Sequence, residues 1–363
     1  MTKTQSKQFA RALPDGLSAN DLKQMYEAMV MTREYDDRGF KLQRQGRIGF
    51  YAGSLGEEAC QIGTAFALEQ RDWVFSSYRQ AGVALHRGVP LQTMMNNLFG
   101  NAQDLAEGKQ MPVHYTSRHN HFLSISSVIG TQIIQGAGCA IAAKSRGDDS
   151  VVITYFGDGA TSSNDFHSGM NFAATFKAPC IFVLVNNQFA ISVPVNKQTA
   201  VEVLADKAKA YGMPGIQVDG NDILAVYHAT KEAVERGRKG EGPTFLELKT
   251  YRVGPHSSSD DPTRYRSQAE TDQWLAQDPI LRFQSVLKSY DLWDETYEAE
   301  LRERIQNQIN AAVKLAESVP QPAWETLFTE VYSYETQVLA DQKKAVLENE
   351  QGLELTNEGE FPL

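Results

Sequence analysis

Two short polar motifs, each placed after an apolar run, constrain the fold of this chain most. Gly157-Asp158-Gly159 closes the apolar run 151–156, and Asn186-Asn187 closes the run 180–185. Asn187 follows Asp158 by roughly 30 residues, which is the length of one strand–helix–strand crossover. Because the carboxyl ends of parallel strands meet at one edge of a sheet, the spacing predicts a parallel sheet with both side chains at the same edge.

The oxygen atoms expected at this edge suit a small hard cation. Mg²⁺ prefers near-octahedral oxygen ligands, usually one or two of them protein carboxylates, and fills its other positions with water and phosphate oxygens. Asp158 supplies a carboxylate, Asn187 an amide oxygen and Phe189 a backbone carbonyl. Gly157 and Gly159 let the chain approach a phosphate closely. The motifs therefore predict a site for Mg²⁺ and a diphosphate.

The segment between the two motifs has the pattern of a crossover helix. The residues 160–163 lead into it, and the N-terminal amides of such a helix favour anions. Pro179 ends the helix before the second strand. The apolar residues at helical spacing are Phe166, Met170, Phe172, Ala173 and Phe176.

The α/β pattern continues through most of the chain. Between about residues 45 and 265, helical patterns alternate with short apolar strands, which is typical of a doubly wound parallel sheet. The strands expected are 151–156, 180–185, 215–218 and 244–248. Near the start, 19–21 is expected to cap a helix. The apolar residues of that helix are Leu22, Met25, Met29 and Met31.

Beyond Gln268 the strand patterns stop. A four-residue apolar step through a charged background predicts an amphipathic helix that buries one stripe. The stripe consists of Leu301, Ile305, Ile309 and Val313. We therefore expect three parts: an N-terminal arm and helix (1–40), an α/β domain (41–267) and a helical C-terminal region (268–363) that serves packing or oligomer contacts.

Composition excludes several classes of function. Of the 363 residues, 42% are hydrophobic and 22% charged, as in a soluble globular protein. A net charge of −10 argues against nucleic-acid and anionic-membrane partners. The sequence has no apolar run of membrane-spanning length and no signal-peptide core at its start.

The cysteines indicate a reducing compartment. Cys60, Cys139 and Cys180 lack metal-ligand spacing and are expected to be buried, reduced thiols. We therefore expect a cytoplasmic protein, or a mitochondrial matrix protein if the source is a eukaryote.

At this point the chain resembles a known family. The segment 157–192 resembles the thiamin diphosphate and Mg²⁺ motif of the alpha subunits of two-subunit 2-oxo acid dehydrogenases. The resemblance covers about residues 25 to 290, and the tail Glu360–Leu363 is similar as well. Further segments look closest to the branched-chain version: LQRQGRIGFYAGSLGEEA (42–59), SSYRQAGVALHRG (76–88), GKQMPVHY (108–115), HFLSISSVIGTQ (121–132), VDGNDILAVYHATKEA (218–233) and GPHSSSDDPTRYRS (254–267).

The resemblance implies how the cofactor is bound at its diphosphate end. Arg79, in the triplet that begins with Ser77, corresponds to the family's diphosphate-binding arginine, and its planar fork of donors matches phosphate. Tyr78 packs against cofactor or substrate, and Arg252 is a second phosphate partner. Gly159 and Ala160 continue the diphosphate contact after Asp158. His256 lies beside the diphosphate, where it donates hydrogen bonds and assists acyl transfer. By contrast, the remaining histidines are expected to pack or face solvent, apart from the ambiguous pair His119 and His121.

The loop 126–132 carries two further implied sites. Ser127 and Ile129 are expected to face the pyrimidine of the cofactor. In the branched-chain subfamily such a loop holds K⁺ through side-chain and carbonyl oxygens. The ligands here would be Ser126, Val128, Thr131 and Gln132.

Two departures from the relatives concern this site. Relatives often have Pro-Leu where this chain has Val128-Ile129, although a carbonyl ligand survives that change. Val185 replaces an arginine that contacts phosphate in the animal branched-chain enzyme, so one positive group is missing from the phosphate shell.

The resemblance also implies the reaction and the partners. Thiamin diphosphate supplies a carbon nucleophile that attacks the 2-oxo carbon, and its cationic ring then takes up the electrons released with CO₂. The glutamate that activates the cofactor is expected on a beta subunit in an α₂β₂ heterotetramer. The acyl acceptor is the lipoyl arm of a dihydrolipoyl acyltransferase. The expected substrates are branched-chain 2-oxo acids such as 3-methyl-2-oxobutanoate, favoured by the segments 46–51 and 257–259. The alternative is a pyruvate dehydrogenase, since loops like 260–267 also occur there.

Readings from other classes are weaker. No G-x-G-x-x-G opens a strand–helix unit, which disfavours a Rossmann-type nucleotide-binding dehydrogenase. A noncatalytic interaction protein is disfavoured because Asp158, Asn187, Arg79 and His256 are all present. Ser257 and Ser267 align with positions phosphorylated in mitochondrial relatives, and a phosphate at Ser257 would repel the diphosphate.

Overall fold

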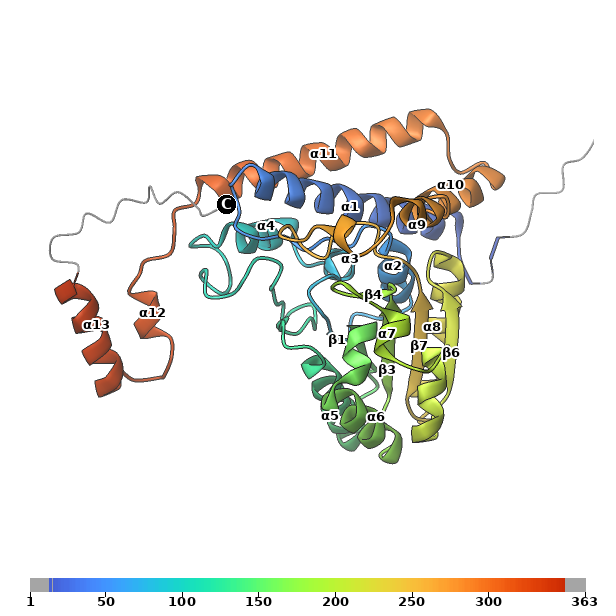
Figure 1. The fold of residues 1–363 in the computed structure, drawn as a ribbon, viewed down its shortest axis with the longest axis horizontal. Coiled ribbons are helices and arrows are strands. Elements are labelled where there is room, and N and C mark those ends of the chain that lie inside the picture. The colour runs from blue at the N-terminus through green and yellow to red at the C-terminus, as the bar shows by residue number, and fades with distance from the viewer. Residues whose placement is uncertain (1–12, 15, 350–363) are drawn as a thin grey trace, which may run out of the picture.

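Five parallel strands form the central sheet of the computed structural model, which describes residues 13–14 and 16–349 (Figure 1). Their order across the sheet is β1-β2-β3-β7-β6. The bounds are β1 Trp73–Phe75, β2 Val152–Gly157, β3 Cys180–Asn186, β6 Gly215–Asp219 and β7 Thr244–Lys249. The sequence predicted four of these strands. It missed β1, whose three residues are too few to show a pattern.

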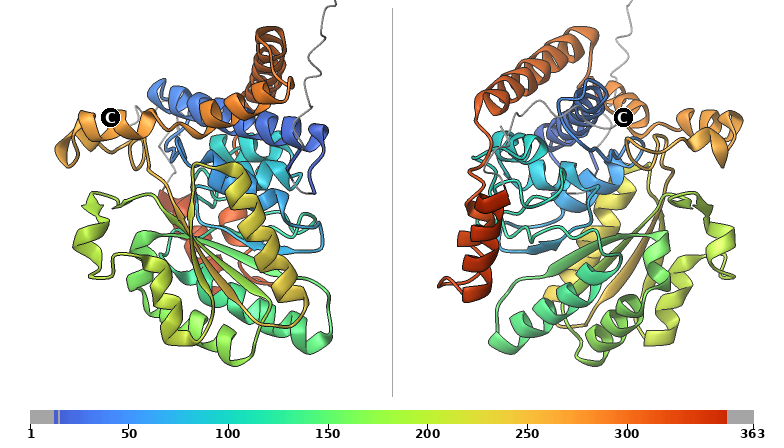
Figure 2. Two further views of the ribbon diagram at one scale, coloured as in Figure 1. Left: turned by 90° about the vertical axis from the view of Figure 1, so that its right-hand side faces the viewer. Right: turned by 60° about the vertical axis from the view of Figure 1, so that its left-hand side comes forward.

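Helices cover both faces of the sheet, as Figure 2 shows. Because successive side chains of a strand point to opposite faces, Ile153 and Val183 pack on one side while Val152 and Phe182 pack on the other. The first side carries α2 (Glu58–Phe66) and α8 (Ile223–Arg238). The second side carries α5 (Thr131–Arg146), α6 (Asn164–Thr175) and the 3₁₀ helix η2 (Leu204–Tyr211). The doubly wound α/β architecture predicted from the sequence is confirmed.

The crossover helix α6 begins where the sequence predicted, directly after 160–163, but two of the apolar residues at helical spacing are not buried. A 3₁₀ turn, η1 (Asp158–Ser162), starts within the first motif, and Ser163 caps α6, where its Oγ accepts a hydrogen bond from the Phe166 amide at 3.1 Å. Phe172 and Phe176 are about half exposed, at 52% and 51%. Helical spacing therefore did not predict the burial of these two residues, because the buried face of α6 carries Gly169 in their place.

The N-cap of helix α1 (Ala19–Arg44) lies one residue before the predicted cap 19–21. Ser18 is the N-cap, and its side chain and that of Asp21 form a capping box. Leu22, Met25 and Met29 are buried as expected, and Met31 is partly buried. The first predicted boundary, at residue 40, falls inside this helix. The division into three parts stays a prediction.

After residue 268 the described chain is helical, with no strand up to residue 349. Its helices are α9 (Gln268–Leu275), α10 (Pro279–Ser289), α11 (Glu295–Ser318), α12 (Thr326–Thr329) and α13 (Gln337–Asn349). The predicted stripe of α11 is buried against α1 and α4 (Leu91–Phe99). Figure 1 shows α11 lying along α1, while α12 and α13 stand apart from the sheet. The similarity noted at Glu360–Leu363, and most of the N-terminal arm, lie outside the described residues.

The remaining elements are short and surround the carboxyl edge of the sheet. They are α3 (Ala81–His86), α4 (Leu91–Phe99), β4 (Phe189–Ala190), β5 (Val193–Pro194), α7 (Val195–Gln198) and η3 (Pro262–Arg264). The three cysteines are free thiols, with Cys60 and Cys180 buried and Cys139 only partly so. Among the described helices, none has the length and apolar character to cross a membrane.

Candidate active site

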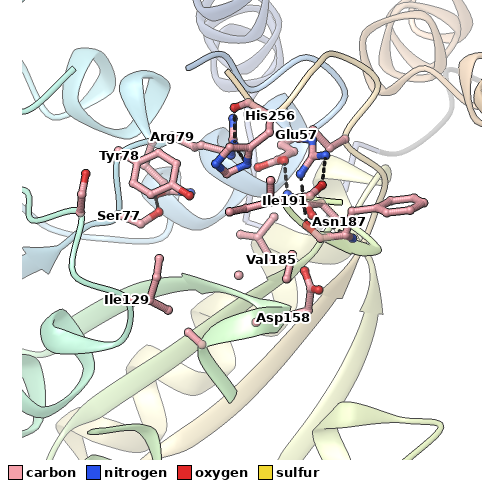
Figure 3. A pocket seen from close by; sticks show the side chains of 18 of the residues that line it. Glu57, Ser77, Tyr78, Arg79, Ile129, Asp158, Val185, Asn187, Ile191 and His256 are labelled. Atoms are coloured by element: carbon pink, nitrogen blue, oxygen red, sulfur yellow. Dashed lines mark hydrogen bonds between the residues drawn. The ribbon is translucent and has the colours of Figure 1, made fainter. Parts of the chain in front are cut away.

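A cavity of about 450 Å³ lies at the carboxyl edge of the sheet, a size common for small-molecule sites. Its walls come from the ends of β2 and β3, from the segments that follow β1 and β7, and from the loop before α5 (Figure 3). The structure brings around it all the residues predicted for cofactor binding: Ser77, Tyr78, Arg79, Ser127, Ile129, Asp158, Gly159, Ala160, Asn187, Phe189, Arg252 and His256. That they bind a cofactor stays a prediction.

Asp158 and Asn187 follow neighbouring strands, as their spacing predicted. β2 and β3 pair in parallel with Gly157 opposite Val185, so both motifs leave the sheet at the same edge. The carboxyl group of Asp158 is 2% exposed, and burial raises its pKa. The side-chain amide of Gln198 on α7 donates a hydrogen bond to Oδ2 of Asp158, a contact that sequence reasoning missed.

Asn187 is held by a second carboxylate that sequence reasoning did not single out. Its Nδ2 donates to Oε1 of Glu57 at 2.6 Å, and its Oδ1 receives only a long contact, 3.4 Å, from the amide of Phe189. Glu57 is 1% exposed, and burial raises its pKa to about 7 although Arg79 and Arg252 oppose the shift. The residues immediately before α2 thus contribute to this cavity.

Arg252 lines the cavity, but most of its donors are already used inside the protein. Nη1 donates to the backbone oxygen of Phe189 at 3.1 Å, and Nη2 donates to that of Ile191 at 2.7 Å and to the Tyr265 hydroxyl at 2.9 Å. Among the described residues no partner is seen for the buried Nε, and Nη1 makes only one of its two possible hydrogen bonds. Arg252 therefore braces the loop that carries the Phe189 carbonyl, and its contact with a phosphate stays a prediction.

Arg79 and His256 lie in direct contact. Nη2 of Arg79 is 2.8 Å from Nδ1 of His256 and donates to the backbone oxygen of His256 at 2.7 Å, while Nη1 donates to the Gly53 oxygen at 2.6 Å. Burial and the two nearby arginines lower the pKa of His256 to about 3, so its imidazole is neutral. The ring of Tyr78 stands edge-on to this imidazole, with centroids 6.1 Å apart.

Ser127 in the loop before α5 also lines the cavity, and it is anchored by a buried histidine. His114 Nδ1 lies 3.0 Å from the oxygen of Pro112, which can only accept, so Nδ1 carries the proton. Nε2 forms the other hydrogen bond of the ring, with the hydroxyl of Ser127 at 2.5 Å. The sequence assigned His114 to packing or surface, which overlooked this contact with a residue of the cavity wall.

Of the residues predicted to ligate K⁺, Ser126 and Val128 lie in the loop before α5, and Thr131 and Gln132 lie in its first turn. The amide of Val128 donates to Ser126 Oγ at 3.2 Å, and the amide of Thr131 donates to the Val128 oxygen at 3.4 Å. Gln132 lines the cavity and donates to the Tyr155 oxygen at 2.8 Å, which leaves its own side-chain oxygen available. Among the described residues no cluster of histidine, cysteine and acidic side chains suits a metal ion, a criterion that does not cover ligand sets of hydroxyl and carbonyl oxygens. The K⁺ site stays a prediction.

The glycines of the first motif fit a closely bound ligand. A Cβ at Gly157 would meet no atom within 4 Å, so a side chain there would occupy open space beside the cavity. A Cβ at Gly159 would come within 2.8 Å of Ala190, so this position must be small for the β4 segment to pack over it. Val185, 2% exposed, presents an apolar surface to the cavity.

These features fit the expected Mg²⁺ and diphosphate. Asp158 is a buried carboxylate with an amide neighbour, and the oxygens of Asn187 and Phe189 emerge from the adjacent strand end, which gives a hard-oxygen donor set. A cation there would offset the burial cost of the Asp158 charge. Arg79 and His256 lie on the opposite wall, where positive charge and a neutral donor suit phosphate oxygens (Figure 3).

The serines that align with phosphorylated positions have structural contacts of their own. Ser257 is 8% exposed, so a kinase would need the loop to open. Ser267 is the N-cap of α9, where its side chain accepts from the amide of Glu270.

Comparison with known proteins places the whole α/β region in one family. The model of the family described as "Dehydrogenase E1 component" matches residues 26–325. The pyruvate dehydrogenase E1 component subunit alpha of Staphylococcus aureus is 45% identical over 339 residues, which cover 93% of this chain and 89% of that protein. The protein of the same name from Staphylococcus epidermidis is 44% identical over the same shares.

Proposed function

The chain belongs to the dehydrogenase E1 component family, whose members are thiamin diphosphate-dependent 2-oxo acid dehydrogenases, and we propose that it is the alpha subunit of such an enzyme. We further propose that its substrate is pyruvate. The observation that carries the choice of substrate is the 45% identity with a pyruvate dehydrogenase alpha subunit across 93% of the chain. The sequence had placed the branched-chain reading first. The relatives favour its alternative.

A branched-chain 2-oxo acid is the second candidate. The segments 46–51 and 257–259 resemble the branched-chain version, and Phe50 of the first segment lines the cavity. Its ring, with Ile129 and Val185, gives the cavity an apolar wall that an aliphatic substrate chain could contact. Substrate preference is therefore the first property to measure.

Different residues of the cavity would bind Mg²⁺, bind the diphosphate and assist acyl transfer. Asp158, Asn187 and Phe189 would hold Mg²⁺, and Arg79 would bind the diphosphate. Bound thiamin diphosphate supplies the carbon nucleophile and the electron sink for decarboxylation. His256, kept neutral, can donate from Nε2 into the cavity and assist acyl transfer.

A beta subunit would complete the site. Of the described residues that line the cavity, the carboxylates are Glu57 and Asp158, and both lie at the expected diphosphate end. The acid that activates the aminopyrimidine must then come from another chain, which supports the α₂β₂ heterotetramer. The acyl group would pass to the lipoyl arm of an acyltransferase.

The test is co-expression with a candidate beta subunit, followed by a substrate panel. Decarboxylation is measured with an artificial electron acceptor, so that the acyltransferase is not needed, and pyruvate is compared with 3-methyl-2-oxobutanoate. We expect the α₂β₂ complex to prefer pyruvate in kcat/KM, and the alpha chain alone to be inactive. A preference for 3-methyl-2-oxobutanoate would select the second candidate, and turnover by alpha alone would contradict the shared site.

A further inference from the structure

Glu57 is a carboxylate of the cavity wall that has no part in the predicted cofactor site. It immediately precedes α2, and its backbone is fixed at both sides: its amide donates to the Ser54 oxygen at 2.8 Å, and its own oxygen accepts from the Gln61 amide at 3.2 Å. Residues on every side of α2 are buried, because the helix packs against α1, α3 and α8. The Glu57 side chain, 1% exposed, is therefore held on a rigid element.

The contact with Asn187 constrains which end of the amide faces Glu57. Nδ2 of Asn187 donates to Oε1 of Glu57 at 2.6 Å. The ionised carboxylate, which Arg79 and Arg252 favour, only accepts, whereas an amide has a donor end and an acceptor end. If the amide were reversed, Oδ1 would meet Oε1 and two acceptors would face each other in a buried site, which is unfavourable. Glu57 thus directs Nδ2 toward itself and leaves Oδ1 for the other side.

That other side is the expected cation site. Oδ1 of Asn187 has only the 3.4 Å contact with the Phe189 amide, so it retains capacity to bind a ligand. Figure 3 shows Glu57 and Asp158 approaching Asn187 from opposite directions, Glu57 from the helical layer and Asp158 from the strand end. An amide that offers its oxygen binds Mg²⁺, and one that offers its NH₂ group does not.

Three charged side chains act on the Glu57 carboxylate at the cavity wall. Arg79 and Arg252 attract the carboxylate, and Glu58 repels it. Glu58 is itself occupied elsewhere, because it pairs with Arg33 at 2.8 Å and accepts from the Gly56 amide at 3.0 Å. The two adjacent glutamates therefore have separate partners: Glu58 ties α2 to α1, and Glu57 faces the cavity.

We propose that Glu57 is a positioning residue for the Mg²⁺ site, which orients the Asn187 amide so that its oxygen faces the cation. The inference rests on the proposed function, since it concerns the cation of the thiamin diphosphate site. Removing a group that orients a metal ligand typically lowers the metal affinity by about 10- to 100-fold. Glu57 acts through Asn187 and touches neither the cation nor the reacting atoms.

The test uses the α₂β₂ complex and measures bound thiamin diphosphate by equilibrium dialysis as a function of Mg²⁺ concentration. In Glu57→Met, which keeps the length of the side chain but has no acceptor, we expect the half-saturating Mg²⁺ concentration to rise about 10- to 100-fold. Glu57→Gln keeps an acceptor oxygen, so its half-saturating Mg²⁺ concentration should rise by less than about tenfold. Glu57→Leu is a second apolar variant if Glu57→Met does not assemble.

Glu58→Gln is the matched control. It removes a buried charge one residue away and breaks the pair with Arg33, so it should lower the melting temperature and leave the Mg²⁺ requirement unchanged. A wild-type Mg²⁺ requirement in an assembled apolar variant overturns the inference. An equal shift in Glu58→Gln does so too, since the effect would then be general loosening of α2. If the wild-type complex itself binds no thiamin diphosphate with Mg²⁺, the proposed function fails as well.

Discussion

Arg79 donates from the single nitrogen Nη2 to both Nδ1 and the backbone oxygen of His256, at 2.8 and 2.7 Å. Because a guanidinium can only donate, Nδ1 of the imidazole must be the acceptor, and the proton of the neutral ring lies on Nε2. Burial, with Arg79 and Arg252, lowers the pKa of His256 to about 3. The contact with Arg79 therefore fixes the tautomer and the backbone of this histidine and helps to keep it neutral.

This arrangement predicts a selective defect in His256→Ala. Without the Nε2 donor, transfer of the acyl group to a lipoyl acceptor should fall by about 10²- to 10⁴-fold, the usual contribution of general acid–base catalysis. Decarboxylation measured with an artificial acceptor should fall much less. His119→Ala, at an exposed position, is the control and should affect neither step. Equal losses in both steps would show that His256 serves cofactor binding instead.

Replacing Asp158 should have opposite effects on stability and on cofactor binding. Burial raises the pKa of Asp158 in the folded chain, so its stability contribution is present at low pH and is lost as the pH rises and the carboxyl group ionises. In the cofactor-free complex at neutral pH, Asp158→Asn should therefore raise the melting temperature. With thiamin diphosphate and Mg²⁺, the wild type should gain stability and the variant should not. Calorimetry with and without the ligands measures both effects, and a variant that still responds to Mg²⁺ would exclude Asp158 as a ligand.

The contacts of Arg252 predict a loss of order in one loop. In Arg252→Met the backbone oxygens of Phe189 and Ile191 would lose their donor, and each unpaired oxygen would cost about 1–3 kcal/mol if it stayed buried. We expect the segment 189–198 to open, with faster amide hydrogen exchange and earlier proteolytic cleavage there. Arg146→Met, at an exposed position, is the control. Unchanged exchange in 189–198 combined with weaker diphosphate binding would support the phosphate contact predicted from the sequence.

What the sequence predicted well was local in origin. The residues Asp158 and Asn187 terminate two apolar runs one crossover apart, and parallel strands joined by a helix can only bring such ends to the same edge. The pairing of Gly157 with Val185 is the direct outcome of that constraint. The stripe of α11 was predictable for the same reason, since the four-residue period fixes which face is buried.

The missed features depend on contacts between distant segments. Glu57 reaches Asn187 across 130 positions, and no period or motif in either segment encodes that meeting. The same holds for the bond between Gln198 and Asp158. In α6 the difference had another source: Phe172 fits the helical spacing of apolar residues, but packing against α5 buries the face that carries Gly169.

His86 gives the protein a predicted sensitivity to mild acid. It is the last residue of α3, and its ring is tilted against that of Phe66, with centroids 5.0 Å apart. Burial together with the adjacent Arg87 lowers its pKa to about 4. A histidine whose folded pKa is depressed contributes stability above its unfolded pKa, and that contribution is lost as the pH falls from about 6.5 toward the folded pKa.

Between about pH 8 and about pH 5, the wild type should therefore lose about 2 kcal/mol more stability than His86→Leu, which cannot bind the proton. Urea unfolding followed by tryptophan fluorescence at both pH values measures this difference. His119→Leu removes an exposed histidine and should keep the pH dependence of the wild type. If His86→Leu and the wild type lose the same stability, the acid sensitivity belongs to other buried groups and His86 titrates alike in the folded and unfolded chain.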